Sequence, residues 1–399
     1  MMTGAAAAPV RRVFLDHNAT SPLRPQARAA MINALDRGGN ASSIHADGRA
    51  ARHLVEQARR EIGALTGADP RGIVFTSGAS EANALALHPA LEVRGRRVTC
   101  DVLLAGAGEH PSVLHGHRFA PEQVEILPLD SGGRIDLAAL DAALARHAAA
   151  GRQALVSVML ANNETGILQP VAEAATLAHA RGAVLHCDAV QGAGRLALDI
   201  AALGADFLTV SSHKMGGPQG AGALVAGHGD NVVRQPLIAG GGQERGRRAG
   251  TENVPALAGF GAAAHAARAE LEGEGARLAA LRDRLEAGIL AQVPDAVVLG
   301  AHVARLPNTA CVIFPGIKAE TLVIALDLAH LSVSAGSACS SGKVGASHVL
   351  KAMGLAEDEA RGAIRLSLGW SSTNEDIDAA LAAIGRTVPR VRNRPERAA

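Results

Sequence analysis

The sequence of 399 residues contains no tyrosine, and aromatic residues make up only 2% of it. Proteins that bind single-stranded nucleic acid stack the bases on aromatic rings, so this mode of binding has few side chains to use here. The formal net charge is +1, which gives no electrostatic reason to expect nucleic acid or an anionic membrane as a partner. We therefore expect an aliphatic core and neither of these partners.

Cysteine is almost as scarce, because Cys100, Cys187, Cys311 and Cys339 lie far apart and form no CxxC pair. This pattern excludes a zinc ribbon and a thioredoxin-type motif, and it argues against a disulfide framework. No spacing of His, Asp and Glu predicts a metal site. No apolar run approaches the roughly 18 residues of a membrane helix, and the N-terminal segment lacks the basic start of a signal peptide. The simplest interpretation is a cytoplasmic protein.

What the sequence does contain is an alternation of apolar runs and amphipathic segments. Leu54, Ala58, Ile62 and Leu65 share one face of a helix predicted over residues 49–66. Continuous apolar runs predict buried strands, and amphipathic segments between them predict helices that begin near residue 81 and span residues 171–182. The strands are predicted at residues 72–76, 154–160, 183–190, 206–214 and 220–226. This alternation predicts an α/β domain with a mainly parallel sheet.

The second part of the chain has a different pattern. A glycine- and arginine-rich stretch at 239–253 is too polar for a core element and predicts a loop. A long helix is predicted over residues 255–290, and shorter elements follow it: strands at 309–314, 331–335 and 363–368, and helices at 318–328 and 374–388. We therefore predict a large α/β domain over residues 16–260, and a smaller α+β domain formed by residues 1–15 and 261–399.

The turn SGAS, residues 77–80, joins a predicted strand to a predicted helix through small residues. Backbone N–H groups and the helix dipole at such a turn attract an anion, and the hydroxyls of Ser77 and Ser80 add donors. Ordinary tight turns between a strand and a helix have similar sequences, so this motif alone does not settle the question.

Two ionisable residues follow the next predicted strands. Asp188 ends the strand in HCDAVQ, and Lys214 follows the strand in VSSHKMGG. The carboxyl ends of parallel strands face the ligand crevice of an open α/β sheet. A turn aspartate and a solvated lysine are the plain alternatives. Together with an anion-binding turn, however, the pair matches the needs of pyridoxal phosphate: a helix N-terminus for the phosphate, a carboxylate for the ring nitrogen and a lysine for the aldehyde.

Beyond these single features, the chain resembles the cysteine desulfurases of the NifS/IscS type, in the class V branch of pyridoxal-phosphate enzymes. The resemblance covers nearly the whole chain in the family's order and spacing. Its matching stretches are LDHNATSP (15–22), GNASSIHADG (39–48), IVFTSGASEANALAL (73–87), GEHPSVL (108–114), NNETG (162–166), HCDAVQ (186–191), SSHKMGGPQGAGAL (211–224), GGGQERGRRAGTEN (240–253), SAGSACSSG (334–342), SHVL (347–350) and IRLSLG (364–369).

The resemblance implies pyridoxal-phosphate fold type I and a role for each matching residue. Lys214 would bind the cofactor aldehyde, Asp188 the ring nitrogen and Gln191 the ring hydroxyl, while His110 would stack on the ring and move protons. The phosphate would be held by Ala79, Ser80, Ser211 and His213, and by Thr251 of a neighbouring subunit, which implies a homodimer with shared sites. Substrate carboxylate would be bound by Asn163 and Arg365.

Cys339 lies in the stretch GSACSSGKVG, whose glycines predict an exposed loop rather than a core element. The residues alone leave open whether this cysteine is a buried hydrophobe or a nucleophile. The resemblance implies a nucleophile that takes sulfur from L-cysteine, leaving L-alanine and a persulfide. The sulfur would then pass to an acceptor such as an iron–sulfur scaffold protein. Cys187 lies inside a predicted strand, and Cys100 and Cys311 stand next to apolar or β-branched residues, so all three are expected to be buried.

Three alternatives stay open at this point. A selenocysteine lyase or another class V enzyme would use a similar pocket, although aminotransfer needs no thiol. A sulfur carrier that has kept the fold without catalysis would not require Lys214, Asp188, His110 and Cys339 together. A purely redox role for Cys339 is disfavoured by the missing CxxC partner.

Overall fold

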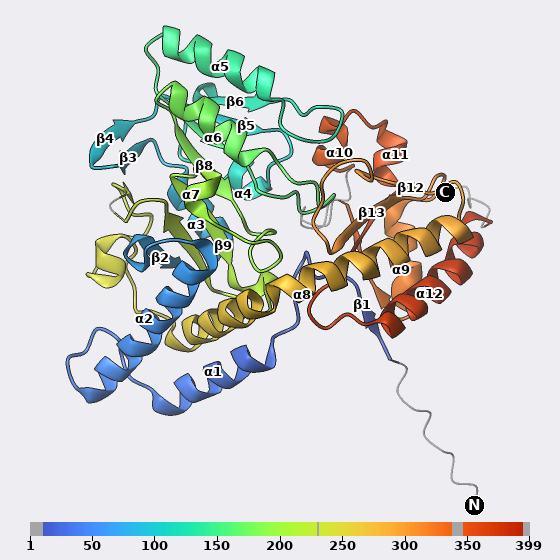
Figure 1. Cartoon of the computed structure of the whole chain (residues 1–399), viewed down its shortest axis with the longest axis horizontal. Coiled ribbons are helices and arrows are strands. Elements are labelled where there is room, and N and C mark those ends of the chain that lie inside the picture. Colours follow the sequence, from blue (N-terminus) through green and yellow to red (C-terminus); the bar gives the residue numbers. More distant parts are fainter. Residues whose placement is uncertain (1–10, 230, 337–345, 394–399) are drawn as a thin grey trace, which may run out of the picture.

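The computed structural model describes residues 11–229, 231–336 and 346–393. Figure 1 shows a large sheet with flanking helices on one side of the molecule and a smaller sheet on the other. Within the described ranges the large sheet has seven strands, in the spatial order β2 (Ile73–Thr76), β10 (Gly222–Ala226), β9 (Phe207–Ser211), β8 (Val184–Asp188), β7 (Ala154–Ser157), β5 (Val102–Gly106) and β6 (Val124–Leu127). Only β10 runs antiparallel to its neighbours. The α/β fold with a mainly parallel sheet is confirmed.

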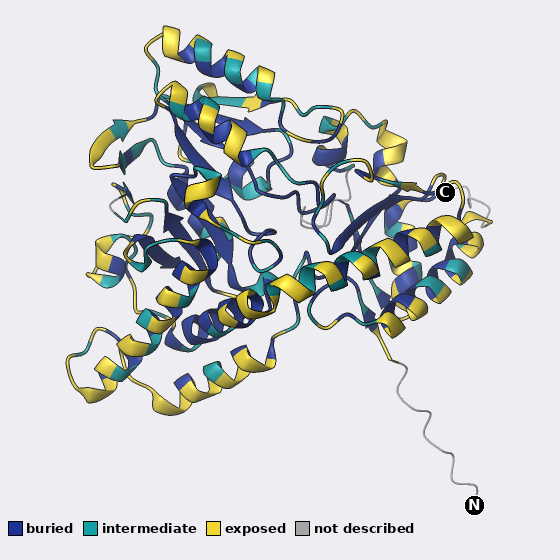
Figure 2. Ribbon diagram, viewed as in Figure 1, coloured by how far each residue is buried: buried dark blue, intermediate teal, exposed yellow. Residues whose placement is uncertain are grey.

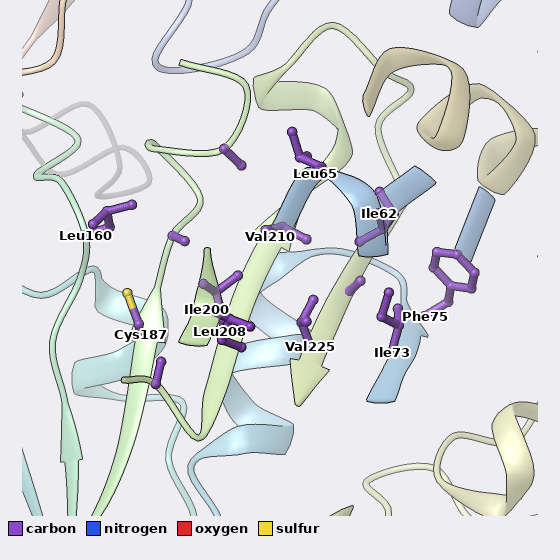
Figure 3. Packing of buried hydrophobic residues seen from close by; sticks show 14 of the residues in the cluster. Ile62, Leu65, Ile73, Phe75, Leu160, Cys187, Ile200, Leu208, Val210 and Val225 are labelled. Carbon is purple, nitrogen blue, oxygen red and sulfur yellow. The ribbon is translucent and has the colours of Figure 1, made fainter. Parts of the chain in front are cut away.

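Both faces of this sheet are buried, because successive side chains of a strand point to opposite sides. Ile73 and Phe75 of β2 belong to one core cluster and Val74 to another. Figure 3 shows the first cluster, in which Ile62 and Leu65 lie beside side chains of β2, β10 and β9. Its helices are α1 (Pro25–Arg37), α2 (Ala46–Thr66), α5 (Leu137–Ala149), α6 (Val171–Ala180), α7 (Ile200–Leu203) and α8 (Val254–Gln292). The second cluster takes in α3 (Ala79–Ala86), α4 (Pro111–Leu114) and a small sheet of β11 (Val232–Val233), β3 (Ala90–Val93) and β4 (Arg96–Thr99).

The smaller sheet lies at the other end of the molecule and is antiparallel, in the order β12 (Val297–Val298), β13 (Thr309–Ile313), β16 (Ala363–Ser367) and β15 (Ser334–Ala335). Apolar residues of α9 (Ala319–Leu328) and α12 (Asn374–Arg392) cover one face. The other face carries α10 (His348–Ala352) and α11 (Glu357–Arg361). The run predicted as one strand at 331–335 is two short strands, because β14 (Leu331–Ser332) pairs instead with β1 (Val13–Phe14).

The long helix α8 contributes to both cores. Its first half places Phe260 and Ala264 in the cluster of the large sheet, and its second half places Leu281 and Leu285 in the cluster of the small sheet. The first part of this helix, residues 254–264, is largely buried, and its exposed residues begin at residue 265; Figure 2 shows this change along the helix. The division of the chain near residue 260 stays a prediction. No helix of the described residues is both long and apolar enough to cross a bilayer.

The polar stretch at 239–253 differs from the sequence-based expectation, because one of its charged side chains is buried. Glu244 accepts two hydrogen bonds from Arg59 of α2, at 2.7 and 2.8 Å, and one from the backbone N–H of Phe75, at 2.9 Å. Glu244 and Arg245 have positive φ angles of 46° and 59°, which non-glycine residues adopt at a cost. The buried ion pair holds this strained turn against the edge of β2.

Replacing Arg59 with Met is expected to destabilise the protein, because it leaves the Glu244 carboxylate buried without its counter-ion. Breaking a buried pair in this way costs about 3 kcal/mol or more. The matched control is Arg60→Met on the exposed face of the same helix, with an effect within about 0.5 kcal/mol. Urea unfolding followed by circular dichroism measures both, and equal midpoints for the two variants would contradict the stabilising role of the pair.

Candidate active site

A cavity of about 550 Å³ opens at the carboxyl ends of the strands of the large sheet. This is where an open α/β sheet places its ligand. Its lining brings together nine of the residues singled out in the sequence: Ala79, Ser80, His110, Asn163, Asp188, Gln191, Ser211, His213 and Lys214. Segments that are more than a hundred residues apart in the chain therefore meet around one pocket.

One end of the cavity is built to receive an anion. The turn after β2 leads into α3, whose cap residue Gly78 supplies no side-chain hydrogen bond to the helix N-terminus. At the end of β9, which is separated from β2 by β10, the buried hydroxyl of Ser211 has no hydrogen-bond partner among the described atoms. Gly222 lets β10 approach this turn, since a Cβ there would lie 2.6 Å from the carbonyl carbon of Gly78. Ser77 is already engaged, because its hydroxyl and its N–H both donate to Glu81.

Asp188, at the end of β8, is linked to His110 by two residues that sequence reasoning missed. Asn83 Nδ2 donates to Asp188 Oδ2 at 2.8 Å and to Ser112 Oγ at 2.9 Å. Ser112 in turn contacts His110 Nδ1 through its hydroxyl at 2.7 Å and its N–H at 3.1 Å. Since a backbone N–H can only donate, Nδ1 is an acceptor and the neutral imidazole carries its proton on Nε2. Burial lowers the pKa of His110, although the Asp188 carboxylate opposes this shift.

Lys214 lies in a short turn after β9, and its side chain reaches the segment near the N-terminus. Its Nζ donates to the carbonyl oxygen of Asn18 at 2.5 Å and to that of Ala19 at 2.9 Å. His213 contacts the hydroxyl of Thr20 at 3.2 Å, so the same segment holds two site residues. Burial lowers the pKa of His213 to about 4, with the charges of Lys214 and Arg195 as further causes. His213 is therefore neutral at neutral pH.

Two further site candidates, Arg365 and Thr251, are not among the residues that line the cavity. Arg365 of β16 is 1% exposed, donates to the carbonyl of Asn163 at 3.0 Å and pairs with Asp16 at 2.7 Å, while its Nε has no partner among the described atoms. Thr251 is exposed, just before α8, and does not line the cavity. Cys339 lies outside the described residues.

Two buried carboxyl groups beside the cavity were not expected from the sequence. Glu109 accepts a hydrogen bond from the N–H of Met159, and burial raises its pKa well above the usual value, with Asp188 adding to the shift. Glu164 accepts from the hydroxyl of Ser347 at 2.5 Å, and burial raises its pKa to about 7. Both lie within family-like stretches, Glu109 in GEHPSVL and Glu164 in NNETG, and that was the only signal that marked them.

The described thiols are poor nucleophiles. Cys100, Cys187 and Cys311 are free and buried, as we expected from the sequence. Burial raises the pKa of Cys100 and of Cys311 to about 12, and it raises that of Cys187 as well. Because the thiolate is the reactive form, these three groups are unsuited to nucleophilic attack at neutral pH.

The residues of the cavity fit pyridoxal phosphate. The donors around Ser80 and Ser211 suit a phosphate, Asp188 suits a protonated ring nitrogen, and Lys214 suits an aldehyde carbon. The unpartnered buried hydroxyl of Ser211 is a donor that such a phosphate would satisfy. In the described part of the chain, no group of three or more His, Cys, Asp and Glu side chains is arranged to hold a metal ion.

Comparison with known proteins agrees with this geometry. Residues 13–380 match the family Aminotransferase class-V. A cysteine desulfurase of Cereibacter sphaeroides is 44% identical, covering 96% of this chain and 97% of that protein. An IscS-like cysteine desulfurase of Mycobacterium tuberculosis is 41% identical, covering 95% and 97%. The crystal structure of a NifS-like protein from Rickettsia africae has a TM-score of 0.84 and 34% identity, covering 96% of this chain and 100% of its own.

The substitution Gly222→Ala is expected to weaken cofactor binding at least tenfold, because the backbone of Gly78 and Ala79 must move away from the added Cβ. The control is Gly273→Ala in α8, where a Cβ meets nothing within 4 Å; this change is expected to stabilise the helix by up to about 1 kcal/mol. Equilibrium dialysis gives the affinity, and circular dichroism checks the fold. Equal cofactor affinities in the two variants would show that the close approach at Gly222 does not matter.

The three buried thiols are expected to resist alkylation. With pKa values of about 12, Cys100 and Cys311 hold on the order of a thousandfold less thiolate at pH 8 than free cysteine. Iodoacetamide labelling with peptide mass spectrometry measures this, and the denatured protein is the control in which all of them react. Rapid labelling of Cys100 or Cys311 in the folded protein would refute their burial.

Proposed function

Because this chain belongs to the class V aminotransferase family, and within it to the pyridoxal-phosphate-dependent cysteine desulfurases, we propose that it removes sulfur from L-cysteine through a persulfide on Cys339. L-Alanine is the other product. The observation that carries this proposal is the meeting of Lys214, Asp188 and His110 in one cavity beside an anion-binding turn.

The cofactor would be held by the residues around that cavity. We assign its phosphate to Ala79, Ser80, Ser211 and His213, its ring hydroxyl to Gln191 and its ring nitrogen to Asp188. Asn83 and the N–H of Val190 donate to Asp188 at 2.8 and 3.0 Å, and these hydrogen bonds fix the orientation of its carboxyl group, which lines the cavity. When bound, the cofactor supplies a ring that accepts electrons from the substrate's Cα.

Proton movements then fall to two side chains. Lys214, which would hold the cofactor's aldehyde, is proposed as the base that takes the Cα proton of the substrate. His110 is proposed to take the proton of the substrate thiol. Because its neutral ring holds a proton on Nε2, acceptance at that nitrogen requires the other tautomer, in which the proton lies on Nδ1 and the Ser112 hydroxyl, 2.7 Å away, accepts it.

The sulfur step requires a thiolate that the three buried cysteines do not offer. The thiolate of Cys339 attacks the sulfur of the substrate, an S–S bond forms and the substrate's Cβ–S bond breaks. The bond electrons stay with the carbon skeleton, which takes up a proton and leaves as alanine. Atoms and charge balance, since a thiolate and cysteine give alanine and a persulfide anion.

Asn163 and Arg365 are proposed to bind the substrate carboxylate, and a planar guanidinium on a strand suits that task.

We further propose that the enzyme works as a cytoplasmic homodimer and passes its sulfur to an acceptor protein such as an iron–sulfur scaffold. The position of Thr251 supports the dimer, because this residue is exposed and stands outside the cavity of its own chain. Its role as a phosphate ligand therefore requires a second copy. We propose a large cofactor-binding unit over 16–260 and a smaller unit over 1–15 and 261–399. Val13 and Leu15 belong to the core of the small sheet, as this division requires, whereas Ala264 of α8 still packs in the core of the large sheet.

Alanine release from L-cysteine by the purified protein tests the function. Without reductant we expect about one alanine per site, because the persulfide stays on the enzyme, and with dithiothreitol we expect repeated turnover. L-Selenocysteine, assayed in parallel, tests the lyase alternative. No alanine from yellow, cofactor-loaded protein would contradict the assigned substrate.

The variant Cys339→Ser is expected to keep the cofactor's visible absorption but to release no alanine and form no persulfide. Cys311→Ser is the matched control, since that thiol is buried in the small core and takes no part in the sulfur step. Persulfide detected by mass spectrometry in the Cys339 variant would overturn the assignment of the nucleophile.

A further inference from the structure

Arg195 is a buried cation that, among the described residues, has no carboxylate partner. It is 9% exposed, and its guanidinium donates to four neutral oxygens: the carbonyls of Gln191 (2.9 Å), His17 (3.0 Å) and Lys214 (3.4 Å), and the side-chain oxygen of Gln191. Burial lowers its pKa to about 9, with the charge of Arg365 as a further cause, so it remains a cation at neutral pH. A buried charge without a counter-ion is costly and therefore calls for a function.

The contact with Gln191 determines what this residue presents to the cavity. Arginine can only donate, so the atom that it contacts must be the amide oxygen. The amide nitrogen then donates one hydrogen to the carbonyl of Asn18, at 3.0 Å. An amide nitrogen carries two hydrogens, and Gln191 lines the cavity, so its second hydrogen is available for an acceptor there. Without Arg195 the amide would be free to turn and present its oxygen instead.

We propose that Arg195 is a positioning residue, which fixes Gln191 as a hydrogen-bond donor to the ring oxygen of the cofactor and favours the ionised form of that oxygen. The inference rests on the proposed function, because it takes the cofactor's ring hydroxyl as the partner of Gln191. A positive charge behind the donor stabilises an anion in front of it.

Other charged groups around the cavity do not replace Arg195. Asp188 is engaged by Asn83, and Glu81 by Arg248 at 2.9 Å. The titratable groups that line the cavity are Lys214, Asp188, His110, His213 and Glu81. Neither carboxylate contacts Arg195. Its guanidinium donates to the backbone carbonyl of Lys214.

The first experiment titrates the visible absorption of the cofactor-loaded protein against pH. Arg195→Met removes the positive charge and the hydrogen bond that orients Gln191. The protonated form of the cofactor's ring oxygen is then favoured over the ionised form. We expect the midpoint to rise by about one pH unit, a tenfold change in the protonation equilibrium. Arg195→Lys keeps the charge, and its midpoint is expected within about 0.3 units of the parent protein's. An unshifted midpoint in Arg195→Met would overturn the proposal.

A second variant keeps the test decisive if Arg195→Met fails to fold. Gln191→Glu gives Arg195 a carboxylate partner but takes away the donor. We expect the loaded variant to titrate at higher pH and to bind the cofactor at least tenfold more weakly than the parent. A variant that binds the cofactor and titrates like the parent would contradict the assigned contact.

These outcomes also separate this proposal from the function on which it rests. If the parent protein binds pyridoxal phosphate and turns over cysteine while both variants titrate as it does, only the role of Arg195 is lost. If the parent protein takes up no cofactor, the proposed function and the role of Arg195 fall together.

Discussion

The active site depends above all on one short segment, residues 16–21, which is tied to both sheets. The side chain of Asn18 donates to Thr309 of the small sheet at 2.9 Å and accepts from Asn308 at 3.1 Å. Its backbone carbonyl accepts from Lys214 and Gln191, which belong to the large sheet's side of the cavity. Because these bonds are buried, moving this segment would leave several polar groups unpaired at once. The side chain of Lys214 is therefore positioned by a segment that is tied to both sheets.

Much of the large sheet and the ends of its strands were predictable from the sequence. Asp188 does end β8, and Lys214 follows β9, because buried parallel strands give continuous apolar runs that small and polar residues interrupt. The helices α1 and α5 and the strand β5 were not assigned. Alanine-rich helices have weak contrast between their faces, and the pattern of hydrophobic residues is then a poor guide.

The polar connections of the site could not be predicted in the same way. Asn83 and Ser112 link Asp188 to His110 across 105 and 29 residues of sequence, and neutral polar side chains leave no periodic trace. The same holds for Glu244, which lies in a charged stretch that predicts an exposed loop. Its burial depends on Arg59, a counter-ion 185 residues away in the sequence. A partner that is distant in sequence decides whether a polar residue can be buried. The resemblance marked several of these stretches without explaining their contacts.

The continuous helix α8 has a consequence for how substrate enters. Its 39 residues span about 58 Å at 1.5 Å per residue, and its two halves are packed into different cores. A hinge motion that brought the two cores together would have to bend this helix and disturb its backbone hydrogen bonds, and Pro255 near its start is the only proline within it. Substrate entry by a hinge motion between the two cores is thus opposed by one continuous helix that both cores share.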